Sequence, residues 1–328
     1  MLSKFCVFAL TFGISTFAPL YMAPVEAQVV DGVDVKKLVD EGIMLSRVGS
    51  YESSMLAIGN FELALKLYKK SGNKEEETKT LNLLALAHNS LGEKQQVLKY
   101  YTQALPLTRE INNRDLEGTV LHGLGAAYAS LGDNQKALLY YNQALSIFRE
   151  LKNYKEALTL NGLGVLYNRT GDKAKAISYF EDALRIYRTV NNRSDMAATL
   201  TNLGKVYALL GQTQKALTNH NQALTIFRAL RDSNGEAVTL SNLGNVYELS
   251  GACKQAIPYY NQSLSVSRVA GNRDNEASAL NNMGKCYLIL GDKNRAISSF
   301  NKSLSLYRAL KDTTGETTVL ANLKKLGR

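Results

Sequence analysis

The chain has 328 residues, of which 45% are hydrophobic and 21% charged, and this composition excludes an intrinsically disordered protein. Only four prolines and no tryptophan occur, while leucine and alanine are abundant, which favours helix over strand and predicts an all-α protein. The net charge of +10 favours nucleic acid, an anionic surface or acidic proteins as partners.

The N-terminal segment predicts a secretory signal peptide at residues 1–27. Lys4 precedes an apolar run at 5–21 that is short for a membrane span. The small residues Val25 and Ala27 suit a cleavage site, so we expect a linker at 28–34 and an exported protein, periplasmic or extracellular, without a transmembrane segment. An uncleaved N-terminal anchor is the alternative. Cleavage removes one basic and one acidic residue, so the net charge stays +10, and export disfavours nucleic acid as a partner.

From residue 35 onward the sequence repeats itself about every forty residues. Glycines recur at spacings of 40, 39, 40, 40 and 40, at Gly92, Gly132, Gly171, Gly211, Gly251 and Gly291. In the copy at 119–153, apolar residues follow three-and-four spacing before Gly132 and again after Asp133, which predicts two helices joined by a tight turn. Gly132 suits a left-handed helix end and Asp133 a helix start. Such a period predicts stacked helix pairs with one continuous core.

The repeated segment resembles a known family. TNLGKVYALLGQTQKAL at 201–217 returns as SNLGNVYELSGACKQAI at 241–257 and as NNMGKCYLILGDKNRAI at 281–297. The Leu-Gly, Tyr, Gly and Ala positions resemble the tetratricopeptide repeat, and the forty-residue period is similar to the variant in kinesin light chains, spindle-orienting adaptors and exported bacterial repeat proteins. The resemblance implies a right-handed α-solenoid of about seven helix-turn-helix units at 35–328, with an irregular first unit at 35–76, regular units at 77–315 and a capping helix at 316–328.

Several residues depart from the repeated pattern. His88 and His220 stand at aromatic positions, where packed histidines are the favoured interpretation. Pro258 lies inside a predicted second helix, so a kink or a late helix start is expected. Cys253 and Cys286 are too few for a disulfide framework and are interpreted either as one bridge between repeats or, preferably, as two buried thiols.

The sequence gives no support for catalysis. Three histidines without metal-ligand spacing predict no metal site. GLGAAY at 123–128 and GLGVLY at 162–167 imitate a dinucleotide motif but lie within predicted helices without a preceding strand. No phosphate loop or nucleophile elbow is present. We therefore expect no enzyme and no cofactor.

Arginines recur near the end of each predicted second helix, at Arg109, Arg149, Arg188, Arg228, Arg268 and Arg308. Acidic residues follow seven or eight positions later, at Glu117, Glu156, Asp195, Glu236, Glu276 and Glu316. We expect ion pairs across the turn, because both charges also suit the helix dipole. A track for a polyanion is the alternative.

Asparagines recur at a position that packing does not require. Each is followed three residues later by lysine or asparagine, so that both lie on one helical face. These predicted partner-binding residues are Asn202, Lys205, Asn242, Asn245, Asn282, Lys285, Asn322 and Lys325. The Leu-Gly-Tyr face packs, which leaves this face for the concave side, the usual peptide groove of the family. Asparagine can hold a peptide backbone and lysine a carboxylate. The alternative is that the amides bond one another within the stack.

We therefore predict a non-enzymatic protein–protein interaction scaffold that binds an extended, acidic peptide segment in its concave groove within residues 198–325. A binder of anionic polymers or of the envelope surface, acting through the net charge of +10, is the competing hypothesis. A role as the regulatory arm of a larger assembly is the third.

Overall fold

A computed structural model describes residues 34–48 and 50–327, and these residues fold into fifteen α-helices with no strand among them. The predicted signal peptide and nearly all of the predicted linker lie outside the described residues. The helices are α1 (Val35–Val48), α2 (Tyr51–Ser71), α3 (Lys74–Ser90), α4 (Lys94–Glu110), α5 (Arg114–Leu131), α6 (Asn134–Glu150), α7 (Lys155–Thr170), α8 (Lys173–Thr189), α9 (Arg193–Leu209), α10 (Thr213–Leu230), α11 (Ser233–Leu249), α12 (Cys253–Val269), α13 (Arg273–Ile289), α14 (Lys293–Ala309) and α15 (Thr313–Leu326).

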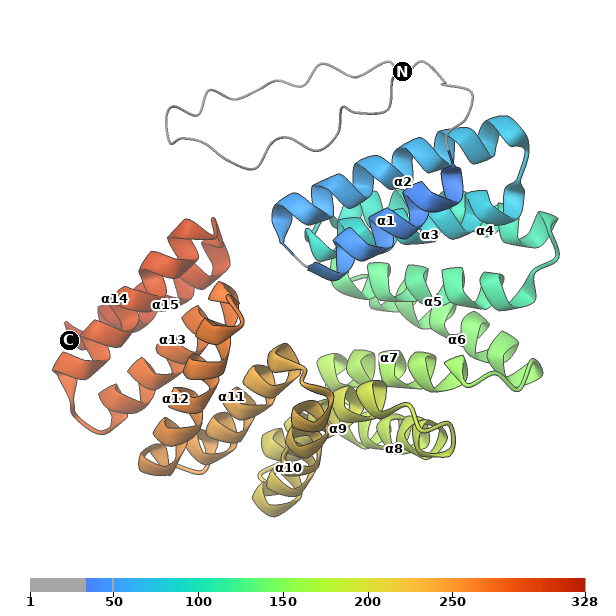
Figure 1. Cartoon of the computed structure of the whole chain (residues 1–328). Coiled ribbons are helices and arrows are strands. Elements are labelled where there is room, and N and C mark those ends of the chain that lie inside the picture. Colours follow the sequence, from blue (N-terminus) through green and yellow to red (C-terminus); the bar gives the residue numbers. More distant parts are fainter. Residues whose placement is uncertain (1–33, 49, 328) are drawn as a thin grey trace, which may run out of the picture.

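The helices stack in chain order into an open arc (Figure 1). Each helix packs on the one before and the one after, which gives seven pairs, α1/α2 to α13/α14, followed by α15. Odd-numbered helices also contact their odd neighbours from α5 to α15, whereas no two even-numbered helices do so to a similar extent in the described part of the chain. The odd helices therefore line the inner side of the arc. This confirms the predicted all-α solenoid.

Capping residues fix the ends of the helices at the predicted places. Asp133 accepts a hydrogen bond from the backbone N–H of Lys136 and opens α6. Gly132 closes α5 with φ of 88°, a left-handed conformation that glycine adopts at little cost. The odd-numbered helices from α9 to α15 are opened in the same way by asparagine or aspartate, as at Asn192 and Asp232, whereas α7 begins after Tyr154 without a side-chain cap.

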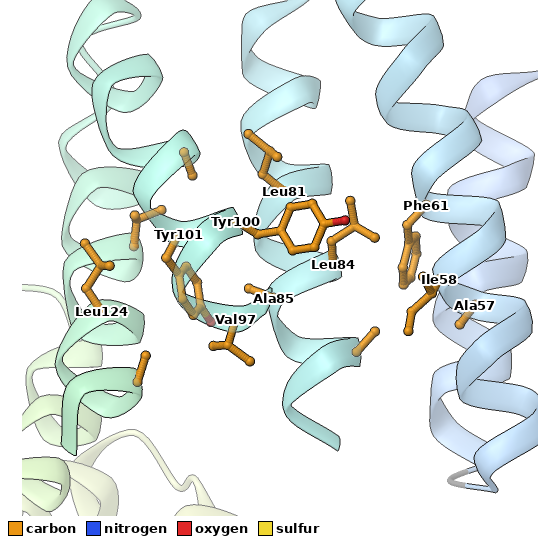
Figure 2. Packing of buried hydrophobic residues seen from close by; sticks show 14 residues of the cluster. Ala57, Ile58, Phe61, Leu81, Leu84, Ala85, Val97, Tyr100, Tyr101 and Leu124 are labelled. Carbon is orange, nitrogen blue, oxygen red and sulfur yellow. The ribbon is translucent and has the colours of Figure 1, made fainter. Parts of the chain in front are cut away.

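Small residues on the odd helices let aromatic side chains of the even helices approach closely. A methyl group on Gly125 would lie only 2.6 Å from Cδ1 of Tyr141, so the ring occupies the space that a side chain would need. Figure 2 shows the same packing in the first pairs, where Phe61, Leu84 and Tyr101 come from three successive helices. The core is therefore one layer that runs from pair to pair rather than a closed globule.

Two of the departures from the repeat can now be placed. α12 begins at Cys253, in phase with Thr213 and Lys293 in the pairs on either side, so the late helix start expected from Pro258 does not occur. The sixth residue of a helix already lies beyond the free N–H groups of the first turn, and α12 accommodates the proline without giving up that turn. Cys253 and Cys286 are both buried free thiols in the same apolar cluster.

Candidate functional site

The predicted asparagine and lysine positions lie on the inner side of α9, α11, α13 and α15. On α9 the stripe that faces away from the packed core contains Ala198, Asn202, Lys205 and Leu209, at helical spacings of four, three and four. The equivalent stripes of the next helices follow forty residues apart. We call these stripes the inner groove, which consists of Ala198, Asn202, Lys205, Leu209, Val238, Asn242, Asn245, Leu249, Ser278, Asn282, Lys285, Ile289, Thr318, Asn322 and Lys325.

Most of the asparagine amides bond to one another across neighbouring odd helices. Asn202 donates to Oδ1 of Asn161 at 3.3 Å, and Asn282 donates to Oδ1 of Asn245 at 3.3 Å. Asn322 donates to Oδ1 of Asn281 at 3.0 Å in a buried contact. These bonds hold successive pairs in register, so part of the asparagine ladder has a structural role.

Asn242 is the exception among the four asparagines. Its side chain is only 8% exposed, and its Nδ2 has no hydrogen-bond partner among the described residues. The residue three positions later, Asn245, already has two hydrogen bonds at its Oδ1, which accepts from Asn282 and, at 2.8 Å, from the hydroxyl of Tyr260. A buried amide without a hydrogen-bond partner lowers the stability of the fold by about 1–3 kcal/mol. Asn242 is thus the asparagine of this row that most lacks an acceptor.

The lysines of the groove differ in availability. Lys205 is exposed and makes no ion pair within the described residues, while the surrounding walls of the groove desolvate it and lower its pKa. Lys285 is paired with Glu248 at 2.9 Å, and Lys325 donates to Oδ1 of Asn322 at 3.4 Å. Lys205 and Lys325 are therefore the cations that a ligand can reach without breaking an ion pair.

A row of exposed apolar side chains runs beside the polar row, and the sequence analysis did not find it. Leu209 is 59% exposed, Leu249 63% and Ile289 64%, each seven residues after an asparagine of the ladder. These three apolar residues recur every forty residues near the end of the odd-numbered helices, and this recurrence was visible in the sequence. An apolar residue at that spacing is normally expected in the core, so the recurrence did not indicate an exposed row. Exposed side chains of this size in a row are a feature of binding surfaces.

Tyrosines explain why the asparagine ladder is absent from the N-terminal half. A methyl group on Gly123 would lie 2.3 Å from Cζ of Tyr101, and one on Gly162 would lie 2.9 Å from Cζ of Tyr141. The tyrosine rings of the preceding even helices thus fill the place that asparagines take later. At the lysine position this half has the exposed Leu86 and, two pairs later, Val165, which makes the groove more apolar there.

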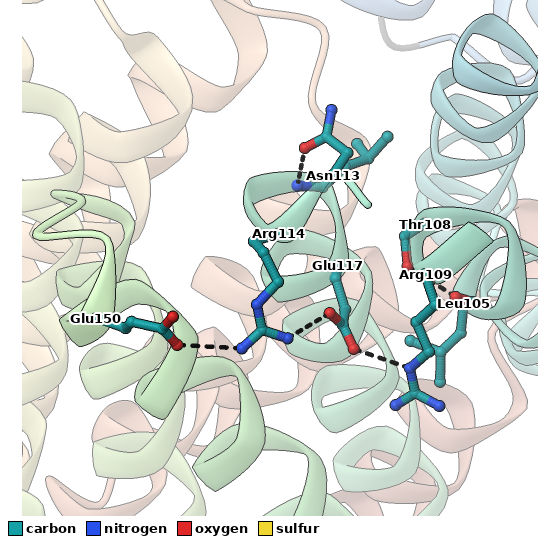
Figure 3. Close-up of polar contacts among 8 residues, drawn as sticks. Leu105, Thr108, Arg109, Asn113, Arg114, Glu117 and Glu150 are labelled. Carbon is teal, nitrogen blue, oxygen red and sulfur yellow. Dashed lines mark hydrogen bonds and ion pairs between the residues drawn. The ribbon is translucent and has the colours of Figure 1, made fainter. Parts of the chain in front are cut away.

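The arginine ladder forms the expected ion pairs in five of six places. The Nε of each arginine lies 2.7 or 2.8 Å from a glutamate oxygen, in Arg109–Glu117, Arg149–Glu156, Arg228–Glu236, Arg268–Glu276 and Arg308–Glu316. Figure 3 shows the first pair, in which Glu117 also binds Arg114. Burial alone would raise the pKa of Glu117, but the hydrogen bonds from both arginines outweigh it and lower that pKa. Most arginine charge is thus neutralised, which disfavours a polyanion track.

Arg188 has no such partner. Met196 stands at the glutamate position, and Asp195, the acid predicted to pair with it, instead accepts from Nδ2 of Asn192 at 2.8 Å. Among residues 34–48 and 50–327 no ion pair to Arg188 is found, and no three side chains of the metal-ligating types are grouped to hold a metal ion.

The model of the tetratricopeptide repeat matches the chain at 77–150, 116–189, 195–268 and 251–309, which together cover more than half of it. The chain belongs to the tetratricopeptide repeat family. No curated protein matches this tetratricopeptide repeat protein in sequence. No helix of its described part is long and apolar enough to cross a membrane.

Solved structures share the fold. The apo form of RapI superimposes with a TM-score of 0.66 at 16% identity, over 85% of this chain and 99% of that one. A Rap protein complexed with competence and sporulation factor gives 0.59 at 13%, over 89% and 98%. BtubC from P. vanneervenii gives 0.58 at 19%, over 67% and 92%. At these identities the similarity shows the fold alone.

Proposed function

We propose that this tetratricopeptide repeat protein is a non-enzymatic scaffold that binds an extended, acidic peptide segment in the inner groove from α9 to α15. The observation that carries the proposal is the parallel arrangement of two rows in this groove. One row presents the exposed Lys205 and Lys325, and the other presents Leu209, Leu249 and Ile289. The family fold supports a protein partner.

The spacing of the rows fits an extended chain. Packed helices lie about 8–10 Å apart, which is the length of about three residues of extended peptide at roughly 3.3 Å each. Because side chains of an extended chain alternate in direction, acidic residues can face the lysines while apolar residues face the leucine row. Asn242 lies beneath this row with its Nδ2 buried, so its unpaired amide would donate to a carbonyl of the bound backbone only after its side chain rotates toward the groove.

The proposal is tested by the binding of a fluorescent peptide of alternating aspartate and leucine to the chain at 28–328. Lys205→Glu is expected to weaken binding by about tenfold or more. Lys302→Glu, on the exposed surface of α14, is the matched control and is expected to bind like the wild type. Leu209→Ser with Leu249→Ser is expected to weaken binding without affecting helicity, since both side chains are already exposed.

The competing hypothesis, an anionic polymer bound by net charge, predicts a different result. Under that hypothesis the two lysine substitutions would be equivalent, and binding would decline steeply with salt regardless of the apolar residues of the peptide. Equal weakening by Lys205→Glu and Lys302→Glu would therefore refute the groove.

We further propose that the protein is exported after cleavage of residues 1–27. The N-terminal basic residue, apolar run and small residues before Gln28 support this proposal. Mass spectrometry of the protein from the periplasm and culture medium of the producing cell is expected to find Gln28 at its N-terminus. An intact N-terminus in the membrane fraction would instead show an anchor.

A further inference from the structure

The outer side of the arc has a hollow between α8 and α10 that the groove does not explain. Its volume is about 500 Å³, and its floor is formed by Leu203 and Tyr207 of α9. Arg185 and Arg188 line it from α8, and Lys215 lines it from α10. Comparison with the other repeats of the same chain shows how this hollow arises.

A tyrosine ring is missing at this place. In three other pairs a tyrosine of the odd helix stacks on one of the even helix with ring centroids 5.4 Å apart, in Tyr128–Tyr140, Tyr167–Tyr179 and Tyr247–Tyr259. In the α9/α10 pair the first partner is Tyr207, but the equivalent of Tyr179 is Asn219. No aromatic ring of the described residues stacks on Tyr207, which is only 8% exposed where it lines the hollow, and Nζ of Lys215 lies 5.1 Å from its ring centroid.

The charges at the hollow also depart from the repeat. Arg188 is the ladder arginine without a glutamate, because Met196 replaces that residue. Arg185 stands where the second helices α4, α6, α10, α12 and α14 have proline, serine or threonine, and of the other second helices α2 alone has a basic residue there, Lys66. Arg185 is paired with Asp182 at 2.9 Å, and Glu181 accepts from the hydroxyl of Tyr207 at 3.4 Å. The guanidinium of Arg188 thus retains its full donor capacity at the edge of the hollow.

We infer that this hollow binds a small aromatic molecule that carries an oxyanion, such as an aryl phosphate. The ring of the ligand enters the hollow beside Asn219, where other pairs have their second tyrosine, and contacts the part of Tyr207 that remains exposed. Its oxyanion accepts hydrogen bonds from Arg188, whose planar guanidinium suits phosphate and carboxylate oxygens, and from Lys215. Tyr287, whose pair has Ser299 at the place of the second tyrosine, borders another hollow, but there the arginine equivalent to Arg188, Arg268, is held by Glu276.

The chain itself suggests the decisive variants. Asn219→Tyr restores the residue that three other pairs contain, so the variant is expected to fold while its ring fills the site. Met196→Glu restores the acid that neutralises the ladder arginine. Arg308→Gln, which removes a paired ladder arginine in another repeat, is the matched control. Circular dichroism checks the helicity of each variant.

Binding is measured by ligand-observed NMR and calorimetry with three probes: phenyl phosphate, inorganic phosphate and phenol. We expect phenyl phosphate to bind more tightly than either other probe, and Asn219→Tyr and Met196→Glu each to weaken it by about tenfold or more while Arg308→Gln does not. Equal binding of phenyl phosphate and inorganic phosphate, or unchanged binding by Asn219→Tyr, would overturn the inference. The hollow lies on the outer side and these variants change none of the asparagines, lysines or leucines proposed to bind the peptide, so this inference and the proposed peptide binding can fail separately.

Discussion

Replacement of His220 by phenylalanine tests the packing of the array most directly. His220 is only 1% exposed in α10, and neither ring nitrogen has a hydrogen-bond partner among the described residues. Its ring lies against Gly204, where a methyl group would meet Cε1 at 2.6 Å. The equivalent positions one pair before and two pairs after have Phe180 and Phe300, which are fully buried. Phenylalanine is therefore already compatible with this site.

The expected gain depends on pH. A buried polar group without a partner costs about 1–3 kcal/mol, so His220→Phe should raise the free energy of unfolding by about 2 kcal/mol near neutral pH. Burial, with a smaller contribution from the charge of Lys205, lowers the pKa of His220 from 6.5 to about 4. Between these values the unfolded chain binds more protons, so the wild type loses stability as pH falls from 6.5 toward 4. This loss amounts to about 2 kcal/mol at about pH 5, and the variant should not show it.

Urea unfolding followed by far-UV circular dichroism, at about pH 7.5 and about pH 5, measures both quantities. Phe300→His, the reverse substitution in an equivalent site, should introduce the same pH dependence. The reasoning is refuted if wild type and His220→Phe lose equal stability between the two pH values, or if the variant is less stable at both.

Three further results are expected. Gly284→Ala should destabilise the array by about 1–3 kcal/mol, because its methyl group would lie 2.6 Å from a phenylalanine ring of α14. Gly59 has open space around it, so Gly59→Ala should stabilise α2 by about 0.5–1 kcal/mol. Thermal unfolding measures both changes. Burial raises the pKa of the Cys286 thiol, so a thiol reagent should label neither Cys286 nor Cys253 until urea unfolds the protein; rapid labelling of the native chain would contradict this burial. Glu117→Gln should cost about 1 kcal/mol above pH 5, and the difference from wild type should shrink as acid protonates the carboxylate, which titration of stability against pH would show.

The sequence predicted the repeat and its packing because both depend on spacing. Glycine followed by a capping residue, as at Gly132 and Asp133, predicts a turn between two helices, and the small residues predict where helices pack closely. Contacts between successive helix pairs depend on how one pair is rotated relative to the next. The spacing of residues in the sequence does not determine this rotation. Asn202 and Asn282 therefore looked like free ligands although each amide reaches the preceding odd helix.

The sequence also did not reveal the effect of an acidic residue that is displaced by one position. Asp195 lies one position before the place of the ladder glutamate, and one residue turns a side chain by about 100° around a helix. Asn192 captures this carboxylate, and Arg188 is left without it. The exposure of Leu209 could not be predicted, because the sequence does not show where the core of a curved array ends.

The contacts between odd-numbered helices give the arc the mechanics of a bent beam. When such a beam curves more tightly, its inner fibres shorten and its outer fibres lengthen, and a rotation of a few degrees at each junction adds up along the seven pairs. The inner groove and the gap between α8 and α10 lie on opposite sides of the same bend. A molecule that pushes α8 and α10 apart on the outer side should therefore bring the odd-numbered helices of the inner groove closer together. A rigid peptide that spreads those odd-numbered helices should narrow the gap between α8 and α10.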